Sequence, residues 1–336
     1  MCHHLRVLEE RLKKIEGKFA NWIAVYGSSK AVKKLNINDF AAGKGKEMKM
    51  INKLWVNMLA LTLSLPAFSE PLVWQVSNGV TEFRITGSIH VGSQALYPLP
   101  KEIEHFLPTS KGLIIEADLT ESSEVQYPIP RYTSEQVLDK EQKAALEQIA
   151  RMLNLPLDQV RLSPPWVSAL TIQIAQIAQL GYHAELGVDN YLIELAKQHQ
   201  LPLIPLESVQ FQINLLANMP QDGKELLISA LEQYAEGEQL LSCLIESWSK
   251  GDGPNLGKFA DVSELSPQLE KVMMTDRNHA WAEQLEQRAQ QQPGKYTVVV
   301  GTLHLVGKEN LLELMEAKGF RVVQLTQSQQ AKCAFD

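Results

Sequence analysis

Two apolar stretches, one near each end of the chain, lead into the same order of small and polar residues. Residues 84–92 read RITGSIHVG, and residues 299–307 read VVGTLHLVG. In each, a β-forming run is followed by a glycine, a hydroxyl residue, an aliphatic residue and a histidine, with a further glycine soon after. An apolar strand that ends in such a turn places polar groups at the mouth of an α/β sheet, where ligands bind. The pattern predicts one site that receives His90 and His304; the alternative is two structural histidines with no shared role.

The segments that follow the two turns also match. Residues 99–107 form an amphipathic stretch opened by a proline, and residues 112–118 form a short buried strand with two carboxylates at its end, Glu116 and Asp118. Residues 309–319 predict a helix that stops at a glycine, and a further strand follows it. We therefore predict an α/β fold with a mixed central sheet. It is built from two pseudo-symmetric β-turn-α-β units that carry Gly-x-x-His, with a large helical insertion between them.

The segment between the two units has mainly helical periodicity. Apolar residues recur at helical spacing over residues 134–153 and 166–180, and a last helix begins at Asp276. A stripe of this kind is usually core, and we interpret it so. One more strand, residues 202–206, ends in Glu207, so a second carboxylate is delivered by a strand end.

The start of the chain does not resemble a folded domain. Residues 48–69 combine lysines, an apolar core too short to span a membrane comfortably and small residues before the cleavage position, which is typical of a secretory signal peptide. We expect cleavage after Ser69 and a periplasmic or secreted protein. Residues 1–47 are polar and basic, and we interpret them as a spurious or disordered extension from a start codon placed too far upstream; a cytoplasmic extension before a signal anchor is the alternative. The α/β domain then covers residues 70–330, and residues 331–336 form a tail.

Composition and charge exclude some partners. The chain is 45% hydrophobic with a formal net charge of −7, and it has no basic stripe to replace the counterions of a phosphate backbone, which argues against nucleic acid. Contact with a membrane is expected only through the signal peptide. Beyond the leader, the cysteines are Cys243 and Cys333. In an oxidising compartment they could form one disulfide, and two free thiols are the alternative.

Four strand ends carry residue types that bind metals: His90, Glu116, Glu207 and His304. Two imidazoles with one or two carboxylates suit Mn²⁺, Fe²⁺, Co²⁺ or Zn²⁺. A hydrolytic metal site also needs a base that takes a proton from water. We expect Glu116 to be a ligand and Glu207 to be the base or an additional ligand. The two roles could be exchanged, and either carboxylate could instead cap the turn that follows it.

Arg277 and Asn278, at the start of the last helix, could hold a substrate carbonyl or an oxyanion. An ordinary role at a helix start is the alternative for both. The chain has no Gly-x-Ser-x-Gly sequence, which disfavours a serine hydrolase. It has neither Gly-x-Gly-x-x-Gly nor a Walker sequence, which disfavours nucleotide chemistry.

Several of these motifs together carry a family resemblance. They are, in order, Gly87-x-x-His90, Glu116, Gly187-Val188-Asp189, Glu207-x-x-Gln210, Arg277-Asn278 and Val300-Gly301-x-x-His304-Leu305-x-Gly307. In this order, over about residues 73–326, the chain resembles the TraB/GumN family, which includes the pheromone-shutdown TraB proteins, the GumN group and, more distantly, the Tiki proteases. The resemblance implies a fold like that of the erythromycin esterase and ChaN group. Through the Tiki branch it implies metal-dependent peptide-bond hydrolysis by the paired histidines and a glutamate. Thr302 and Leu303 stand where many relatives have smaller residues, which could narrow the pocket.

The sequence therefore favours an exported, Tiki-like metalloprotease with a divalent metal held by His and Glu, and with a peptide or protein substrate. A haem- or metal-binding protein without turnover, like ChaN, is one alternative. A metal-independent esterase is the other. The substrate, the metal and the oligomeric state stay open at this point.

Overall fold

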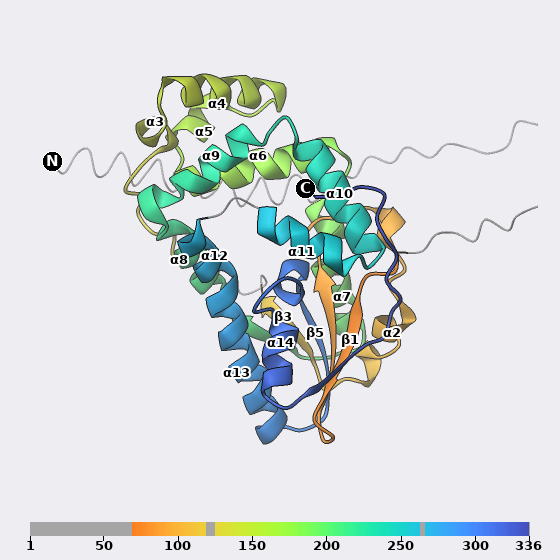
Figure 1. Ribbon diagram of the computed structural model, residues 1–336. Helices are drawn as coiled ribbons and strands as arrows, with labels where there is room; N and C mark the ends of the chain where they lie inside the picture. The colour runs from red at the N-terminus through yellow and green to blue at the C-terminus, as the bar shows by residue number, and fades with distance from the viewer. Residues whose placement is uncertain (1–68, 119–124, 263–265, 336) are drawn as a thin grey trace, which may run out of the picture. The chain divides into compact units, whose positions relative to one another are not determined.

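Within the residues that the computed structural model describes (69–118, 125–262 and 266–335), six strands form one mixed sheet in the order β4-β3-β5-β2-β1-β6 (Figure 1). The strands are β1 Val73–Ser77, β2 Glu82–Ser88, β3 Leu113–Ala117, β4 Leu203–Glu207, β5 Lys295–Gly301 and β6 Arg321–Gln324. The pairs β2–β5, β3–β5 and β3–β4 are parallel, and β1 is antiparallel to both of its neighbours. The predicted α/β class with a mixed sheet is confirmed. The interpretations of residues 1–47 and of residues 48–68 lie outside the described residues.

The helices connect these strands and cover the sheet. They are α2 Lys101–Glu104, α3 Ser134–Val137, α4 Lys140–Met152, α5 Leu157–Leu162, α6 Pro165–Gln179, α7 Val188–Gln198, α8 Val209–Ala217, α9 Lys224–Glu232, α10 Gly237–Ser249, α11 Gly253–Val262, α12 Pro267–Glu270, α13 Asp276–Gln291 and α14 Leu311–Ala317. A π-helical turn, η6 (Lys271–Thr275), leads directly into α13, and a 3₁₀ turn, η7 (Thr302–Leu305), follows β5. None of the helices in the described part of the chain is long and apolar enough to cross a membrane.

The two strands that lead to Gly-x-x-His are direct neighbours in the sheet. The register of β2 and β5 pairs Phe83 with Tyr296 and Ser88 with Gly301. Because the strands are parallel, His90 and His304 leave the sheet at the same edge. The two motifs are one residue out of step in this register, since Gly87 pairs with Val300 rather than with Gly301. Pseudo-symmetry between the two units stays a prediction.

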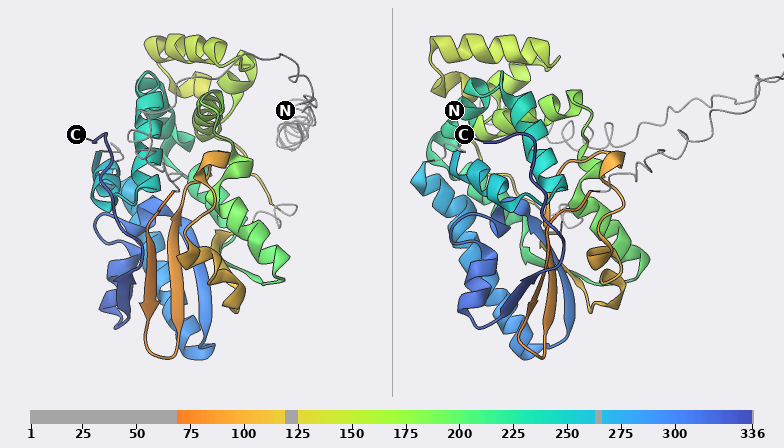
Figure 2. Two further views of the ribbon diagram at one scale, coloured as in Figure 1. Left: turned by 90° about the vertical axis from the view of Figure 1, so that its right-hand side faces the viewer. Right: turned by 45° about the vertical axis from the view of Figure 1, so that its right-hand side comes forward.

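Alternating side chains give the sheet two apolar faces. On one face Val298 and Val300 of β5 pack into a core with residues of α13 and α14, among them the fully buried Trp281. On the other face Val299 packs into a second core with residues of α2, α7 and α10. Figures 1 and 2 show α13 and α14 on one side of the strands and α7 on the other. Because successive strand residues point to opposite faces, the almost continuous apolar run of β5 fits its burial between two helical layers.

A group of helices from the insertion has a core of its own, beyond one end of the strands (Figure 1). Helices α3, α4, α5, α6 and α9 enclose a separate apolar cluster that includes Leu146, Ile172 and Leu227. Helix α10 joins this group to the sheet, because Trp248 Nε1 donates a hydrogen bond of 2.9 Å to the carbonyl oxygen of Gly87. The insertion therefore lies at the carboxyl end of β2, the same end from which the two histidines emerge.

The single helix expected over residues 134–153 is two helices, α3 and α4. Leu138, between them, is extended, and Asp139 begins α4 by accepting a 2.8 Å hydrogen bond from the backbone N–H of Gln142. The Gln142 side chain in turn accepts from the backbone N–H of Asp139, which completes a capping box. The capping box therefore starts a new helix at this point, although the apolar periodicity continues across the break between α3 and α4.

The chain end is fastened to α10 and α11. Cys243 and Cys333 form a disulfide, which resolves the two alternatives left open by the sequence. The backbone N–H of Ala331 donates to Asp252 Oδ2 at 2.7 Å, and that of Phe335 donates to Asn255 Oδ1 at 3.2 Å. The segment expected to be a tail is thus packed against the domain as far as residue 335.

Candidate active site

Four strand ends deliver the predicted site residues to the carboxyl edge of the sheet. Glu116 is the fourth residue of β3, and Glu207 is the last of β4. His90 follows the end of β2 by two residues, and His304 lies in the 3₁₀ turn η7 after β5. Because β3, β4, β5 and β2 are all parallel and adjacent, their carboxyl ends meet at one edge.

Gly301 marks the point where these side chains converge. Its backbone N–H donates a 2.6 Å hydrogen bond to Glu116 Oε1. A Cβ on this glycine would lie 3.2 Å from Glu116 Oε1, 3.6 Å from His304 Cδ2 and 4.0 Å from His90 Nε2. The two imidazoles therefore face one common point next to a carboxylate, and they do not lie on opposite faces of the sheet.

His90 is held by a carboxylate and remains open to solvent. Its Nδ1 lies 2.9 Å from Asp189 Oδ2, and its side chain is 70% exposed. The hydrogen bond to Asp189 raises the pKa of His90 to about 9, with help from the negative charges of Asp189 and Glu116. Asp189 comes close because Gly187 precedes it: a Cβ at Gly187 would lie 2.6 Å from the carbonyl oxygen of His90.

His304 is held by an amide and is only 4% exposed. Its Nδ1 lies 2.6 Å from Asn278 Oδ1, and its ring centre is 4.3 Å from that of Trp281. An amide oxygen can only accept, so Nδ1 carries the proton and Nε2 keeps its lone pair. Burial lowers the pKa of His304 to about 3, and the positive charges of Arg277 and His90 act in the same direction. The ring is therefore neutral near pH 7.

Arg277 lies between the two glutamates. Its Nη2 donates to Glu116 Oε2 at 2.7 Å, and its Nε and Nη2 donate to the two oxygens of Glu207 at 2.8 and 2.9 Å. Its Nη1 lies 3.2 Å from His304 Nε2 and also donates to the carbonyl oxygen of Met273. Burial would raise the pKa of Glu116, but the positive charges of Arg277 and His90 and the hydrogen bond from the Gly301 N–H hold it below its usual value. Arg277 thus joins three of the predicted site residues in one buried network.

The chain matches a known protein family over most of its length. The model of the TraB/PrgY/gumN family matches residues 72–324. The chain is 31% identical over 266 residues to YbaP of Escherichia coli, and 30% identical over 266 residues to YbaP of Shigella flexneri. Each match covers 79% of this chain and 97% of the relative. The chain belongs to the TraB/PrgY/gumN family. No solved structure matches it.

The TraB/PrgY/gumN match confirms the family resemblance seen in the sequence, and the matched region holds every candidate residue. Asn278, at the start of α13, fixes His304 and also donates through Nδ2 to the carbonyl oxygen of Glu309 at 3.0 Å. Arg277 and Asn278 both have contacts that go beyond a role at a helix start. Their function in catalysis, like that of the other site residues, stays a prediction.

Three residues around the site were not assigned to it from the sequence. Asp189 is part of the family motif, but the sequence alone gives it no role at the site. Trp281 was placed in a helix, and its Nε1 donates to Glu207 Oε1 at 2.9 Å. Gln212 Nε2 lies 3.2 Å from Glu207 Oε2 and 3.4 Å from Glu116 Oε2. Its position five residues after Glu207, on the first turns of α8, is the signal that could have found it.

The donor set has the chemistry of a metal site, whereas its arrangement is that of an ion-pair network. In the described ranges, no group of three or more His, Cys, Asp or Glu side chains is arranged to hold a metal ion. In each histidine an acceptor binds Nδ1, so Nε2 is the nitrogen that is left for a metal. His304 Nε2 already has a lone pair, whereas His90 Nε2 gains one when the ring loses a proton. Histidines that ligate metals almost always have their second nitrogen bound in this way. Glu207 differs, because both of its oxygens accept from Arg277 and one also accepts from Trp281.

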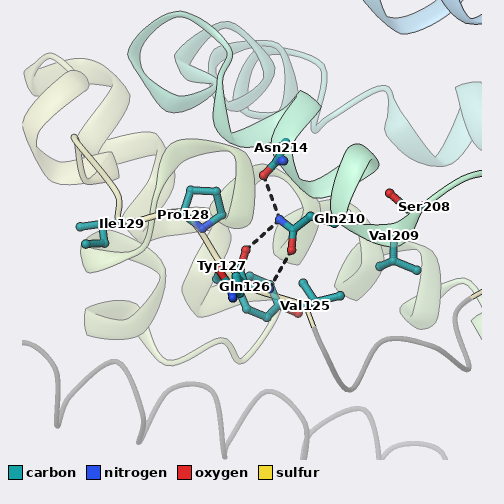
Figure 3. A pocket seen from close by; sticks show the side chains of 9 residues that line it. All are labelled: Val125, Gln126, Tyr127, Pro128, Ile129, Ser208, Val209, Gln210 and Asn214. Atoms are coloured by element: carbon teal, nitrogen blue, oxygen red, sulfur yellow. Dashed lines mark hydrogen bonds between the residues drawn. The ribbon is translucent and has the colours of Figure 1, made fainter.

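A separate hollow of about 730 Å³ lies to one side of the start of α8 (Figure 3). Gln210 spans it, donating to the carbonyl oxygen of Gln126 and accepting from the backbone N–H of the same residue. None of the histidines or glutamates of the site lines this hollow. Gln210 is part of the family motif, and the structure gives it a role in holding the backbone at Gln126.

Proposed function

We propose that this TraB/PrgY/gumN protein is a metal-dependent hydrolase that cleaves peptide bonds. The observation that carries the proposal is the orientation of the two imidazoles. Asp189 and Asn278 bind the two Nδ1 atoms, and the opposite edges of both rings, at His90 Nε2 and His304 Cδ2, lie near the same point beside Glu116. Such second partners fix the tautomer and direction of histidines that bind metals.

His90, His304 and Glu116 would hold the ion. Two imidazoles and a carboxylate suit Mn²⁺, Fe²⁺, Co²⁺ or Zn²⁺. The bound ion would supply Lewis-acid polarisation of the scissile carbonyl and an acidified water. For this chain, His304 Nε2 would exchange its contact with Arg277 Nη1 for the ion. Arg277 would keep its hydrogen bonds to Glu207 through Nε and Nη2.

Glu207 is the proposed base, but both of its oxygens already accept hydrogen bonds. Its Oε1 accepts from Arg277 and Trp281, and its Oε2 accepts from Arg277 and Gln212. To take a proton from water, one oxygen has to give up a donor. A positioning role, in which Glu207 holds Arg277 in place, fits the same contacts without rearrangement. Rates and metal content of a Glu207→Gln variant separate the two roles.

Arg277 is better placed to organise the site than to bind substrate. Its five hydrogen bonds go to Glu207, Glu116, His304 and the carbonyl of Met273. A guanidinium has five N–H donors, so no donor is left over for a substrate oxygen while all of these contacts persist. Release of the His304 contact would free one N–H for a carbonyl oxygen or an oxyanion next to the reacting group.

Hydrolysis without a metal is the second candidate. The observation that favours it is the contact between Arg277 and His304 Nε2, which leaves the imidazole engaged. In this case the neutral form of His90, oriented by Asp189, would take the proton of the attacking water, and Arg277 would stabilise negative charge. Because the pKa of His90 is raised to about 9, this activity should increase as the pH rises towards 9.

Export is part of the proposal. Disulfides persist in oxidising compartments such as the periplasm, and the Cys243–Cys333 bond fits a protein that is folded there. Amino-terminal sequencing of protein recovered from the periplasm tests the expected mature start near Glu70. An uncleaved chain recovered from the cytoplasm would contradict the signal peptide.

One experiment tests the reaction class. The purified mature protein is analysed for bound metal, treated with a chelator, and assayed on a peptide library before and after Mn²⁺, Co²⁺ or Zn²⁺ is restored. Cleavage that disappears with the chelator and returns with the metal supports the first candidate. Peptide cleavage or ester hydrolysis that continues unchanged after chelator treatment supports the second candidate, hydrolysis without a metal. A haem absorption band without any turnover would favour a binding protein instead.

A further inference from the structure

Helix α8 is mainly apolar, but none of its residues is fully buried. It begins directly after Glu207, with Ser208 as its cap, and reads VQFQINLLA. Phe211, in its first turn, is 45% exposed. The other residues of α8 are half-buried, so the helix keeps apolar surface in contact with water next to the candidate site, and large surfaces of this kind mark binding sites.

A hollow of about 550 Å³ lies between α8 and α13. Its wall is mainly apolar and is formed by Leu206, Phe211, Leu215, Val272, Ala280 and Trp281. These residues come from the end of β4, from one face of α8, and from η6 and α13. The hollow has the size and apolar lining of a site for a small organic group.

The hollow is continuous with the candidate active site through two residues. Glu207 and Arg277 line it; Arg277 contacts Glu116 and His304, and Glu207 is bound to Arg277. Their side chains are only 7% and 9% exposed. A group that fills the hollow therefore lies against the buried network of the site, so it would belong to the molecule on which the site acts.

Charge at the hollow is already neutralised. Arg277 forms ion pairs with both glutamates, and Asp276 forms an ion pair with Lys271. A charged group entering the hollow would lose water without gaining a free counter-charge, which is costly. An aliphatic or aromatic group would instead cover Phe211 and Val272, both of which are exposed to water.

We propose that the hollow between α8 and α13 is a specificity subsite that binds an apolar side chain of the peptide substrate, of the size of leucine or phenylalanine. This inference rests on the proposed peptide hydrolysis for the identity of the ligand, but its binding part can be measured without turnover.

The central variant is Ala280→Leu, which places a larger side chain in the hollow from the exposed side of α13. Gln287→Leu is the matched control, because it adds the same side chain to an exposed position of the same helix that does not line the hollow. Phe211→Ala is a second variant that removes a wall of the hollow without filling it. Circular dichroism and thermal unfolding establish that each full-length protein is folded.

The first measurement is binding of acetyl-leucine amide, acetyl-alanine amide and acetyl-aspartate amide to the chelator-treated protein, by saturation-transfer NMR. The wild-type protein should prefer the leucine probe. Ala280→Leu and Phe211→Ala should weaken its binding by about tenfold, the usual effect of changing an apolar pocket, and Gln287→Leu should not change it. Equal binding of the three probes by the wild type, or unchanged leucine binding in both variants, would overturn the subsite.

The second measurement is the rate of peptide cleavage with leucine, phenylalanine, alanine or aspartate at each position near the cleaved bond. At one position Ala280→Leu should lower kcat/KM by about tenfold for leucine and phenylalanine and little for alanine. If the probes bind selectively but no peptide is cleaved, the apolar site stands and the proposed hydrolase fails. If peptides are cleaved with no side-chain preference that Ala280→Leu alters, the hydrolase stands and the subsite fails.

Discussion

The two histidine turns of this protein begin with the same residue pattern and end in opposite environments. His90 is largely exposed and bound to the carboxylate of Asp189, whereas His304 is buried and bound to the amide of Asn278. Their pKa values diverge accordingly, to about 9 for His90 and to about 3 for His304. A sequence motif thus fixes where an imidazole leaves the sheet, while the helix that packs against it decides the charge of the ring.

This difference suggests a division of labour at the site. His304 is held neutral and immobile against Trp281, which suits a permanent ligand. His90 has to lose a proton before it can bind an ion, because metals bind the neutral imidazole. Loss of the proton from His90 should therefore determine how metal binding depends on pH. The following predictions test the comparison, from the largest expected effect to the smallest.

Replacement of either histidine should remove activity, but only one replacement should weaken the fold. We expect His90→Ala and His304→Ala both to lose bound metal and peptidase activity to background, because each removes one of few ligands. His304→Ala also leaves the buried Oδ1 of Asn278 without its hydrogen bond and removes one contact of Arg277 Nη1, at a cost of about 1–3 kcal/mol. His90→Ala should change the free energy of unfolding by less than about 0.5 kcal/mol, since its side chain is mostly exposed. Metal content, rates and urea unfolding of one preparation measure all three quantities; full activity in both variants would refute the hydrolase.

Substitution of Glu207 and substitution of Glu116 should have different effects on metal content and rate in the same assays. Glu207→Gln should keep much of the metal and lower the rate by about 10²–10⁴-fold if Glu207 is the base. Glu116→Gln should lose the metal, because Glu116 faces the point where both imidazoles converge. Loss of metal in Glu207→Gln with retention in Glu116→Gln would reverse the two assignments. If Glu207→Gln lowers the rate only slightly, Glu207 is not the base, and its role is to position Arg277.

If the carboxylate beside His90 becomes an amide, or the amide beside His304 becomes a carboxylate, the pKa values of the two rings should move closer together. Asp189→Asn removes the charge that raises the pKa of His90, and Asn278→Asp adds a carboxylate beside His304, which should raise its pKa. We expect each change to alter metal affinity by about 10–100-fold, as for other outer partners of metal-binding histidines. NMR titration of the imidazoles in the metal-free protein measures the pKa values. An unchanged His90 titration in Asp189→Asn would show that Asp189 does not set the state of the ring.

The smallest effect is expected in the pH dependence of stability of the metal-free protein. The pKa of His90 is raised from 6.5 to about 9 in the folded protein, so its stabilising contribution is complete below pH 6.5 and is lost as the pH rises through 9. Solvent screening at the exposed ring keeps this contribution small. The pKa of His304 is lowered from 6.5 to about 3, so the unfolded chain binds the extra proton and stability falls as the pH drops from 6.5 towards 3. Urea unfolding at several pH values measures both limbs; His90→Gln should flatten only the alkaline limb, and His304→Gln only the acidic limb.

The sequence was sufficient to place the principal site residues because they follow strands. Apolar runs that end in Gly-x-x-His or in a glutamate predict strand ends, and parallel strand ends share one edge of a sheet. His90, Glu116, Glu207 and His304 were found for this reason. The sequence did not show that β2 and β5 are neighbours, because strand order depends on contacts between distant segments.

The partners of the histidines were harder to predict, because they come from helices packed over that edge. Asp189 lies in the first turn of α7, where an acidic residue is expected for capping alone. Arg277 lies in the first turn of α13, and its contacts to both glutamates depend on the angle at which α13 crosses β4. Local capping also decided the break at Asp139, which the long apolar period concealed. Periodicity therefore predicted the elements, whereas the ring partners required the tertiary structure.

The disulfide has a consequence for the integrity of the protein after proteolysis. Arg277, Asn278 and His304 all lie between Cys243 and Cys333. A single cut of the backbone anywhere in this interval leaves two pieces that remain covalently joined, each also held by the sheet or by α10. Such a nicked molecule would migrate as one band on a gel without reductant and as two bands with it. In a compartment rich in proteases, the half of the site that carries His304 could thus survive a break in the chain that would otherwise release it.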